Sequence, residues 1–167
     1  MRKYQNSVIL SLLVGIGALL FFINQKATET PKGKQIQHAR NLEVINSTKG
    51  PKFDSTWFDA KYQVIVFAHG LSNYSLLNFD WTPYFENNPE IRFIFYYSGK
   101  DRSKLEEWME GNGFQRPILY DPDRKFYASN VTGDTNGITF NTKDGIVQFL
   151  ENPSFPNYQD FLNELKE

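Results

Sequence analysis

The chain has 167 residues, enough for one domain with accessory segments, and its 40% hydrophobic content with 15 Phe, 9 Tyr and 3 Trp can form a packed core. A formal net charge of -1 gives no electrostatic basis for nucleic-acid binding. The absence of cysteine excludes disulfides, thiolate metal sites and thiol catalysis. The two histidines, His38 and His69, are too few for a histidine-rich metal site. We therefore expect no catalytic residue, no metal and no cofactor.

An uncharged, apolar segment near the N-terminus predicts a membrane anchor. Arg2 and Lys3 precede an uncharged run over residues 5–25, and a bilayer core takes about 17–25 residues to cross. The alternative is a cleaved signal peptide. The run is longer than the roughly 7–15 apolar residues of a signal peptide, and no small-x-small cleavage site follows it. The basic residues favour a cytoplasmic N-terminus. Residues 1–25 are thus expected to form a cytoplasmic end and an anchor, with residues 6–24 in the membrane.

The remainder of the chain divides into a tether and one domain. Residues 26–40 are polar and are expected to be a flexible tether. Residues 41–167 have globular character and are expected to form a single domain. With a cytoplasmic N-terminus and a single membrane pass, this domain lies on the extracytoplasmic side of the membrane.

The first half of the domain is predicted to contain a short strand, a buried strand and a helix. Residues 42–46 suit a short strand. Residues 62–70 form a continuous β-branched and aromatic run, which is typical of a central strand buried on both faces. Residues 75–90 are predicted to be a helix that Pro83 kinks or shortens. The apolar positions of this helix are Leu76, Leu77, Phe79 and Trp81.

The second half begins with another buried strand, over residues 91–99, and a helix over residues 101–114. Ser103 and Glu106 fit a capping box at the start of that helix, and Gly111 fits its stop. The remaining segments are a short strand and turn (116–122), a short helix (123–133), a hairpin (137–151) turning at Lys143-Asp144-Gly145, and a closing helix (157–167) with Tyr158, Phe161, Leu162 and Leu165 at helical spacing.

This order of elements predicts an α/β fold with a mixed sheet. The early alternation of strands and helices implies parallel pairing through right-handed crossovers. The late hairpin adds an antiparallel pair. We therefore expect a mixed central sheet with helices on both faces.

Three stretches of sequence, taken in this order, resemble the thioredoxin-like superfamily, and more narrowly its membrane-anchored or exported bacterial members. In that family a buried strand leads through a turn into a Cys-x-x-Cys pair. Here the strand is YQVIVFAHG, and Ser72-Asn73-Tyr74-Ser75 takes the place of the pair. The stretch IRFIFYYSGKDRSKLEEWMEGNGFQRPILYDPDRKFYASN resembles the next strand, helix and following segment, and GITFNTKDGIVQF resembles the final hairpin. The resemblance covers residues 42–167 and implies a three-layer sandwich in the cell envelope, on the periplasmic side.

The chain departs from the family at its active-site positions. Both cysteines are serine, and Gly137 stands where the family has a cis-proline before the hairpin strand. Disulfide exchange needs an attacking thiolate and a resolving thiol, so the chain is redox-inactive as written. The degenerate active-site positions are Ser72, Asn73, Tyr74, Ser75 and Gly137. By resemblance, the surface that holds extended peptides in relatives comprises His69, Tyr74 and Gly137.

Structural roles compete with chemical ones at the polar candidates. A helix cap at Ser72 or Ser75 is favoured over a hydrolase nucleophile, because GLSNYS lacks the second glycine of a nucleophile elbow. His69 is favoured as a packed or half-exposed histidine at a strand end rather than a catalytic base. Asp121 and Asp123 have the chemistry to bind a cation, but a turn rich in Asp and Pro explains them more simply.

Three functional interpretations stay open. The first is a membrane-anchored, redox-inactive thioredoxin-like domain that binds a protein or peptide outside the cytoplasm. The second is a serine-substituted member of a thiol-disulfide oxidoreductase family whose cysteine-bearing relatives are active, the substitution being natural or engineered. Gly137 favours natural loss, since an engineered inactive form has no reason to lose the proline. The third is an anchored globular domain without an inherited site.

Overall fold

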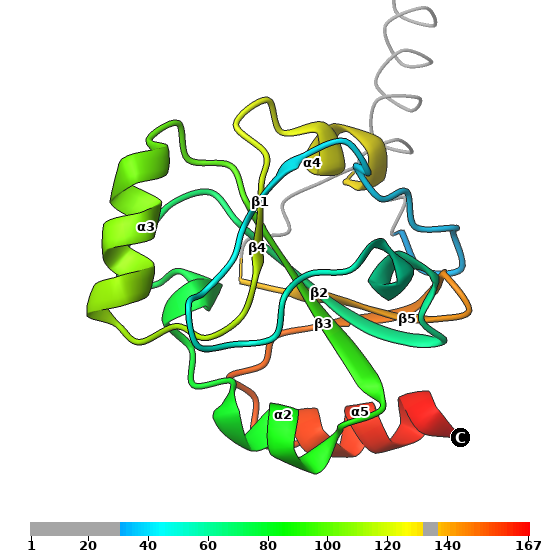
Figure 1. The fold of residues 1–167 in the computed structure, drawn as a ribbon. Coiled ribbons are helices and arrows are strands. Elements are labelled where there is room, and N and C mark those ends of the chain that lie inside the picture. The colour runs from blue at the N-terminus through cyan, green and yellow to red at the C-terminus, as the bar shows by residue number, and fades with distance from the viewer. Residues whose placement is uncertain (1–30, 132–136) are drawn as a thin grey trace, which may run out of the picture. The chain divides into compact units, whose positions relative to one another are not determined.

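The computed structural model describes residues 31–131 and 137–167 (Figure 1). Within these residues six strands form one sheet in the order β1-β4-β3-β2-β5-β6. The strands are β1 (Glu43–Ile45), β2 (Tyr62–Ala68), β3 (Ile91–Tyr97), β4 (Ile118–Tyr120), β5 (Thr139–Lys143) and β6 (Ile146–Glu151). The β2–β3 and β3–β4 pairs are parallel, and the other three are antiparallel. The predicted mixed α/β sheet is confirmed.

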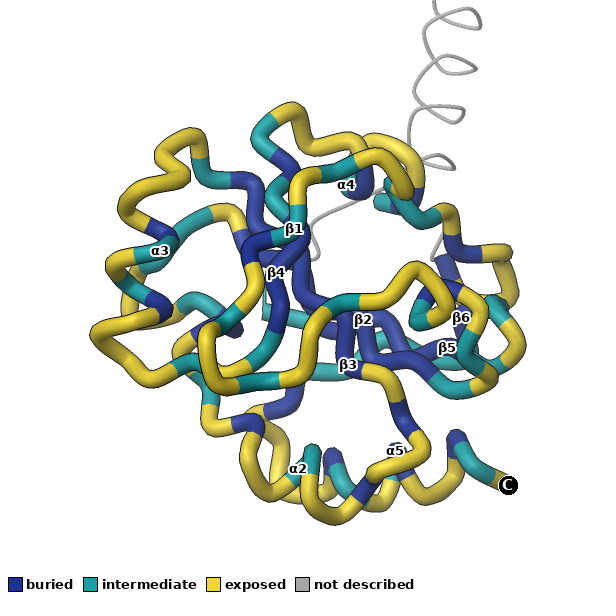
Figure 2. The backbone as a smooth tube through the Cα atoms, in the orientation of Figure 1, coloured by how far each residue is buried: buried dark blue, intermediate teal, exposed yellow. Residues whose placement is uncertain are grey.

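Helices cover both faces of this sheet, which explains the continuous apolar sequence of its central strands. Val64, Ile65 and Val66 of β2 are fully buried, and the middle strands are dark blue in Figure 2. Val64 and Val66 pack in one core cluster with residues of α2 (Thr82–Asn87), α3 (Arg102–Gly111) and α5 (Tyr158–Lys166). Ile65 packs in a second cluster with residues of the 3-10 helix η1 (Ser55–Asp59) and of α4 (Lys125–Asn130). These three layers match the expected sandwich.

The helix predicted over residues 75–90 is interrupted. A short 3-10 helix, η2 (Leu76–Asn78), is followed by an extended residue and then by α2. The interruption buries Trp81, which is 2% exposed and whose indole Nε1 donates to the Leu76 carbonyl over 2.8 Å. Pro83 lies in the first turn of α2, where its missing N–H costs nothing. Proline therefore starts a separate helix here instead of kinking a continuous one.

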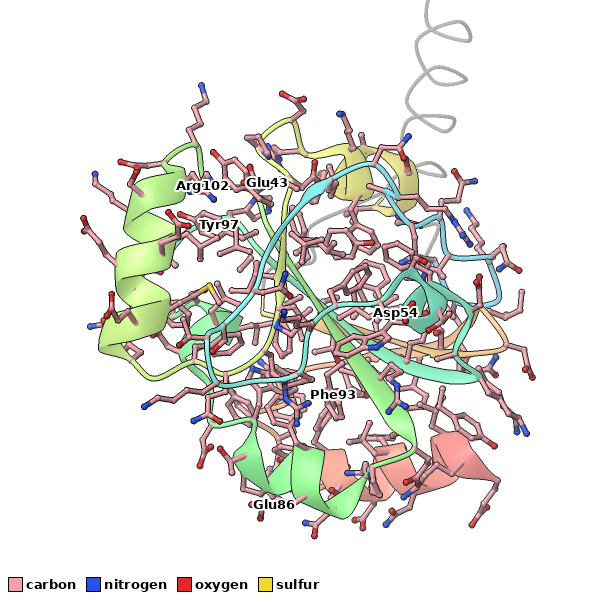
Figure 3. The ribbon with its side chains drawn as sticks, in the orientation of Figure 1. Glu43, Asp54, Glu86, Phe93, Tyr97 and Arg102 are labelled. Carbon is pink, nitrogen blue, oxygen red and sulfur yellow. The ribbon has the colours of Figure 1, made fainter. Side chains whose placement is uncertain are left out.

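The caps of α3 also differ from the prediction. Asp101, rather than Ser103, caps the helix by accepting from the Lys104 backbone N–H over 3.1 Å. Instead of capping, Glu106 forms an ion pair with Arg102, at 2.6 Å from its Nη1. Arg102 Nε also pairs with Glu43 of β1 at 2.8 Å (Figure 3). Gly113 has a φ of +62°, so it supplies the left-handed residue after the helix that was assigned to Gly111.

The hairpin of β5 and β6 forms as predicted. Lys143 pairs with Ile146, so Asp144 and Gly145 form a two-residue turn. Their φ values of 52° and 75° are both positive, as a type I′ turn requires. The predicted closing helix is α5, whose Tyr158, Leu162 and Leu165 are buried in the core.

Part of the segment predicted as a tether is docked on the domain. We call residues 32–40 the docked segment. Its Gly33 N–H donates to the Val147 carbonyl at 2.7 Å, and its Ile36 N–H donates to the Gly145 carbonyl at 2.8 Å. Gln35 forms an antiparallel bridge with Ile146 of β6. Ile36 is 6% exposed in the second core cluster. The docked segment therefore extends the edge of the sheet instead of linking it loosely.

No helix in residues 31–131 and 137–167 is long and apolar enough to cross a membrane. The anchor expected over residues 6–24 lies outside the described residues, as do residues 26–30 of the expected tether. The anchor and the orientation of the chain therefore stay predictions.

Candidate functional site

The Ser-x-x-Ser stretch forms a closed turn rather than the start of an α-helix. The Ser75 N–H donates to the Ser72 carbonyl at 2.8 Å, and Asn78 Nδ2 donates to the same carbonyl at 2.7 Å. Ser75 Oγ accepts from the Leu77 N–H at 3.3 Å and caps η2. The capping interpretation of Ser75 is thus supported by geometry, on a 3-10 turn.

This turn presents Tyr74 to solvent. Tyr74 is 96% exposed, and among the described residues the other exposed large hydrophobic side chain is Phe155, at 54%. Asn73 beside it is also exposed. A nearly fully solvated tyrosine on a turn held by backbone hydrogen bonds is a feature that packing within the described domain does not explain.

His69 lies at the carboxyl end of β2 and contacts its neighbours by packing. Its Nδ1 lies 3.1 Å from the Ser98 hydroxyl. Its ring packs edge-on against Phe67 and Tyr127, at centroid distances of 4.6 and 5.4 Å. His69 is exposed, and the serine that this nitrogen contacts is Ser98, not a member of the serine turn. These contacts favour a strand-end histidine over a base for Ser72 or Ser75.

Gly137 has a backbone conformation that proline cannot adopt. Gly137 lies two residues before Thr139, the first residue of β5, which pairs with Val66 of β2. The φ of Gly137 is +74°, whereas the proline ring fixes φ near -65°. Among the described residues, a Cβ at this position would meet the Asn152 amide at 3.9 Å, and Gly137 itself is partly exposed. Gly137 thus precedes by two residues the strand that pairs with the carboxyl-terminal half of β2, the strand that leads to His69 and the serine turn.

A groove that sequence reasoning missed lies beside the serine turn. It has a volume of about 550 Å³ and is lined by aromatic side chains of η2, α2 and the end of α3, among them Phe79, Trp81, Phe85, Trp108 and Phe114. Trp108 Nε1 donates to Asn78 Oδ1 at 3.1 Å, and the Asn78 amide N–H also binds the Ser72 carbonyl. Asn78 therefore belongs to both the groove wall and the turn. In the sequence, the feature that could have indicated this groove is the group of unevenly spaced aromatic residues within 79–85.

Asp121 and Asp123 have structural roles. Asp121 is fully buried, and its two carboxylate oxygens accept from the N–H groups of Lys125 and Phe126, each at 2.8 Å. Asp123 is exposed and forms an ion pair with Lys125 at 3.6 Å. In the part of the chain that the structure describes, no group of three His, Asp or Glu side chains is placed to hold a metal.

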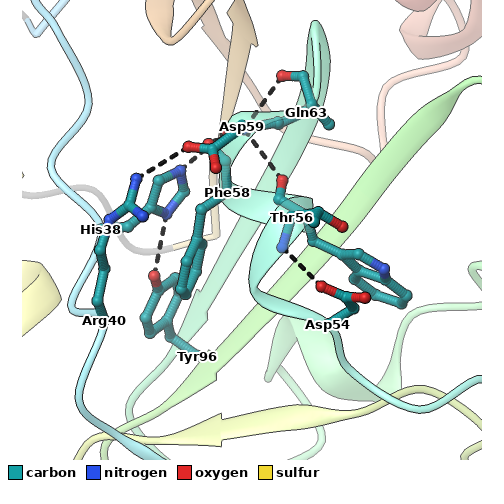
Figure 4. Close-up of polar contacts among 10 residues, drawn as sticks. His38, Arg40, Asp54, Thr56, Phe58, Asp59, Gln63 and Tyr96 are labelled. Carbon is teal, nitrogen blue, oxygen red and sulfur yellow. Dashed lines mark hydrogen bonds and ion pairs between the residues drawn. The ribbon is translucent and has the colours of Figure 1, made fainter.

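A buried polar network, also missed by sequence reasoning, anchors the docked segment (Figure 4). His38 Nδ1 lies 3.0 Å from the Tyr96 hydroxyl, and His38 Nε2 lies 3.0 Å from Gln63 Oε1. Gln63 in turn donates to the Phe58 carbonyl at 2.8 Å. Burial lowers the pKa of His38 to about 4 and raises that of Tyr96. Both side chains are therefore neutral, and the network is suited to holding chain segments together.

Comparison with known proteins identifies the fold. No protein-family model and no curated protein matches the chain. A thioredoxin-like protein solved in its oxidised form aligns with a TM-score of 0.55 at 11% identity, covering 74% of this chain and 95% of that one. A thioredoxin-like protein from Neisseria meningitidis aligns with a TM-score of 0.54 at 10% identity, covering 77% and 91%. AhpC from Mycobacterium tuberculosis aligns with a TM-score of 0.51 at 15% identity, covering 81% and 90%. The chain thus has the thioredoxin-like fold, and it has no cysteine.

Proposed function

We propose that this protein is a membrane-anchored, redox-inactive thioredoxin-like domain that binds a peptide or protein segment outside the cytoplasm. The observation that carries the proposal is the serine turn, which presents Tyr74 with 96% of its surface exposed. By sequence resemblance, this turn takes the place of the family's thiol pair. Tyrosine is enriched at protein interfaces because its ring buries a large area at a small cost in conformational entropy.

Two further features support binding over catalysis. A serine hydroxyl cannot form the mixed disulfide of thiol exchange. Ser75 Oγ already accepts a backbone hydrogen bond, as a cap does. Gly137 is partly exposed and carries no side chain. An extended peptide could therefore approach its backbone and contact the aromatic side chain of Tyr74.

The test places a photoreactive phenylalanine analogue at position 74 of the full-length protein in its native membranes. We expect discrete crosslinked products that include a second polypeptide. The matched control carries the same analogue at position 155, a second exposed aromatic position among the described residues. Products at both positions with the same pattern, or none at position 74, would contradict a binding surface at the turn.

The membrane anchor is tested separately. Mass spectrometry of the membrane-extracted protein is expected to give an intact N-terminal segment, because the apolar run has no cleavage site after it. A mature terminus near Ala27 or Thr28 would show that the segment is a cleaved signal peptide. The peptide-binding proposal is independent of that result.

The second candidate function is a serine-substituted oxidoreductase. The fold, shared with a thioredoxin-like protein solved in its oxidised form, is the observation in its favour. The backbone at Gly137 argues against it, because its φ of +74° is one that a proline cannot adopt.

A further inference from the structure

We infer that a pocket at the amino end of β3 binds a carboxylate attached to an apolar body, through Arg92 and Arg116. The pocket has a volume of about 350 Å³. Its other walls are largely apolar and include Pro51, Trp57, Phe85, Pro89 and Ile91. A volume of this size accommodates a single amino-acid side chain with its carboxylate.

The fold brings the two arginines together from separate elements. Arg92 is the second residue of β3, and Arg116 lies just before β4, the parallel neighbour of β3. The Arg92 guanidinium lies 6.0 Å from the Trp57 ring centroid, and its Nη1 donates to the Pro89 carbonyl at 3.0 Å. The Arg116 guanidinium lies 4.0 Å from the Phe85 ring centroid. A guanidinium stacked on a ring keeps its N–H edge available for an anion.

Neither arginine has an acidic partner within the described residues. Arg40 and Arg102 form ion pairs at 2.9 Å or less, but no ion pair joins Arg92 or Arg116 to a carboxylate. The nearby Glu90 is paired with Lys166 at 3.1 Å. Burial and the positive charge of Arg92 both lower the pKa of Arg116. Arg116 is half-buried and lies close enough to the exposed Arg92 for their positive charges to repel, which is unfavourable without an anion between them. A bound anion would remove that cost.

The residues that line the pocket indicate which class of anion it would bind. Planar, two-pronged recognition by arginine suits carboxylate and phosphate alike. The apolar walls favour an anion with a hydrophobic body, such as the last residue of a peptide or a small organic acid. The pocket lies at the amino end of β3, whereas the serine turn follows the carboxyl end of β2, its parallel neighbour. The pocket adjoins the aromatic groove, because Pro51, Phe85 and Arg116 line both, but no residue of the serine turn lines it. This inference therefore stands without the proposed function.

The experiment measures binding of N-acetylphenylalanine and of its neutral amide to the full-length protein by calorimetry. We expect the acid to bind at least about tenfold more tightly than the amide, because a hydrogen bond to a charged group is lost in the amide. Arg116→Gln and Arg92→Gln should each reduce the affinity for the acid by a similar factor. Arg116→Lys, which keeps the charge but loses the planar fork, should give an intermediate affinity.

The matched control is Arg124→Gln. Arg124 also stacks on an aromatic ring, 4.4 Å from the Tyr127 centroid, but it lies outside the pocket. Its variant should bind the acid as the unchanged protein does. Circular dichroism of each variant verifies the fold. Equal binding of acid and amide, no binding of either, or equal loss in the Arg124 variant would overturn the inference.

Two further probes identify the source of the carboxylate. A hexapeptide ending in a free phenylalanine should bind more tightly than N-acetylphenylalanine if the ligand is a peptide C-terminus, and equally or less tightly if it is a small acid. The same hexapeptide with an amidated C-terminus should bind with the affinity of N-acetylphenylalanine amide, because both lack the carboxylate. Inorganic phosphate should compete weakly, since it has no apolar body. Stronger competition by phosphate than by the acid would contradict the assignment of a carboxylate.

Discussion

His38 illustrates how burial changes the chemistry of one side chain. It contacts Tyr96 and Gln63 through its two ring nitrogens, and burial lowers its pKa from 6.5 to about 4. The unfolded chain therefore binds a proton to His38 between these pH values and the folded chain does not. Stability is then present above pH 6.5 and is lost as the pH falls toward 4.

We predict that the free energy of unfolding decreases by up to about 3 kcal/mol through this window because of His38. The measurement is the unfolding free energy from urea titrations at pH 7, 6, 5 and 4, compared between the protein and His38→Gln. The variant should lose this part of the pH dependence. Tyr96→Phe is the control, since it removes a hydrogen bond but leaves the buried imidazole. Identical slopes in the protein and His38→Gln would contradict the prediction.

Ser72 and Ser75 have a geometry that suits a disulfide although they lack its chemistry. A turn closed by a hydrogen bond from residue i+3 to residue i has Cα atoms less than about 7 Å apart, and a disulfide needs about 4.4–6.8 Å. Ser72→Cys with Ser75→Cys should therefore oxidise within one molecule under a mild oxidant. Thiol titration and mass measurement detect the bond. The single variant Ser72→Cys controls for intermolecular pairing.

The reactivity of such thiols should be ordinary. The turn leads into a three-residue 3-10 helix, and no α-helix is aligned with it to stabilise a thiolate. We therefore expect a thiol pKa close to the usual value of about 8.5, and slow exchange with a generic disulfide substrate. Thiols that stay reduced would show that the turn is not closed as described. A strongly acidic thiol would show that its electrostatic surroundings are different.

At the scale of one element, the N-terminus of α3 is capped by Asp101 and not by the capping box that the sequence offers at Ser103. Ser103 and Glu106 match a capping box, yet Asp101 accepts the N–H of Lys104 and Glu106 pairs with Arg102. We predict that Asp101→Ala lowers the unfolding free energy by about 1 kcal/mol, the usual contribution of an N-cap. Ser103→Ala should change it by less than about 0.5 kcal/mol. Chemical denaturation measures both changes in unfolding free energy. A larger loss for Ser103→Ala than for Asp101→Ala would mean that Ser103 caps the helix after all.

At the scale of the whole molecule, the docked segment decides where the domain begins. It donates backbone hydrogen bonds to the β6 edge, and its Gln37 exchanges hydrogen bonds with Asn130, whose side-chain oxygen accepts at 2.7 Å and whose amide donates at 2.8 Å. It also buries Ile36. The domain in this structure therefore starts near residue 32 and not at residue 41.

We predict that a chain starting at residue 31 keeps the stability of the domain, whereas one starting at residue 41 loses about 3 kcal/mol or more. The loss combines the burial of Ile36, worth about 1.5–3 kcal/mol, with partners of His38 and Gln37 left unsatisfied. Urea denaturation of the two chains measures the difference. Equal midpoints would mean that residues 32–40 act as a tether after all.

The local shape of the candidate site was not predictable from the sequence, and its function stays a prediction. The strand before Ser72 was recognisable from its continuous apolar run, and the order of elements pointed to the place of the thiol pair. That the pair forms a turn depends on Trp81 and Asn78, which bind the Leu76 and Ser72 carbonyls and are contacts formed by folding. The Arg92–Arg116 pocket could not be foreseen, because its two arginines lie on different elements.

Residue identity and order were enough to predict the mixed sheet, its buried central strands and the absence of thiol chemistry. Burial on both faces demands an uninterrupted apolar strand, and redox exchange demands sulfur, so both conclusions follow from residue identity alone. That residues 32–40 are docked on the domain could be learned from the tertiary structure alone. Their composition is that of a flexible linker, but Asn130 and Gln63, distant in the chain, supply the hydrogen bonds that dock them. Local pattern cannot encode such partners, because they become neighbours only when the chain folds.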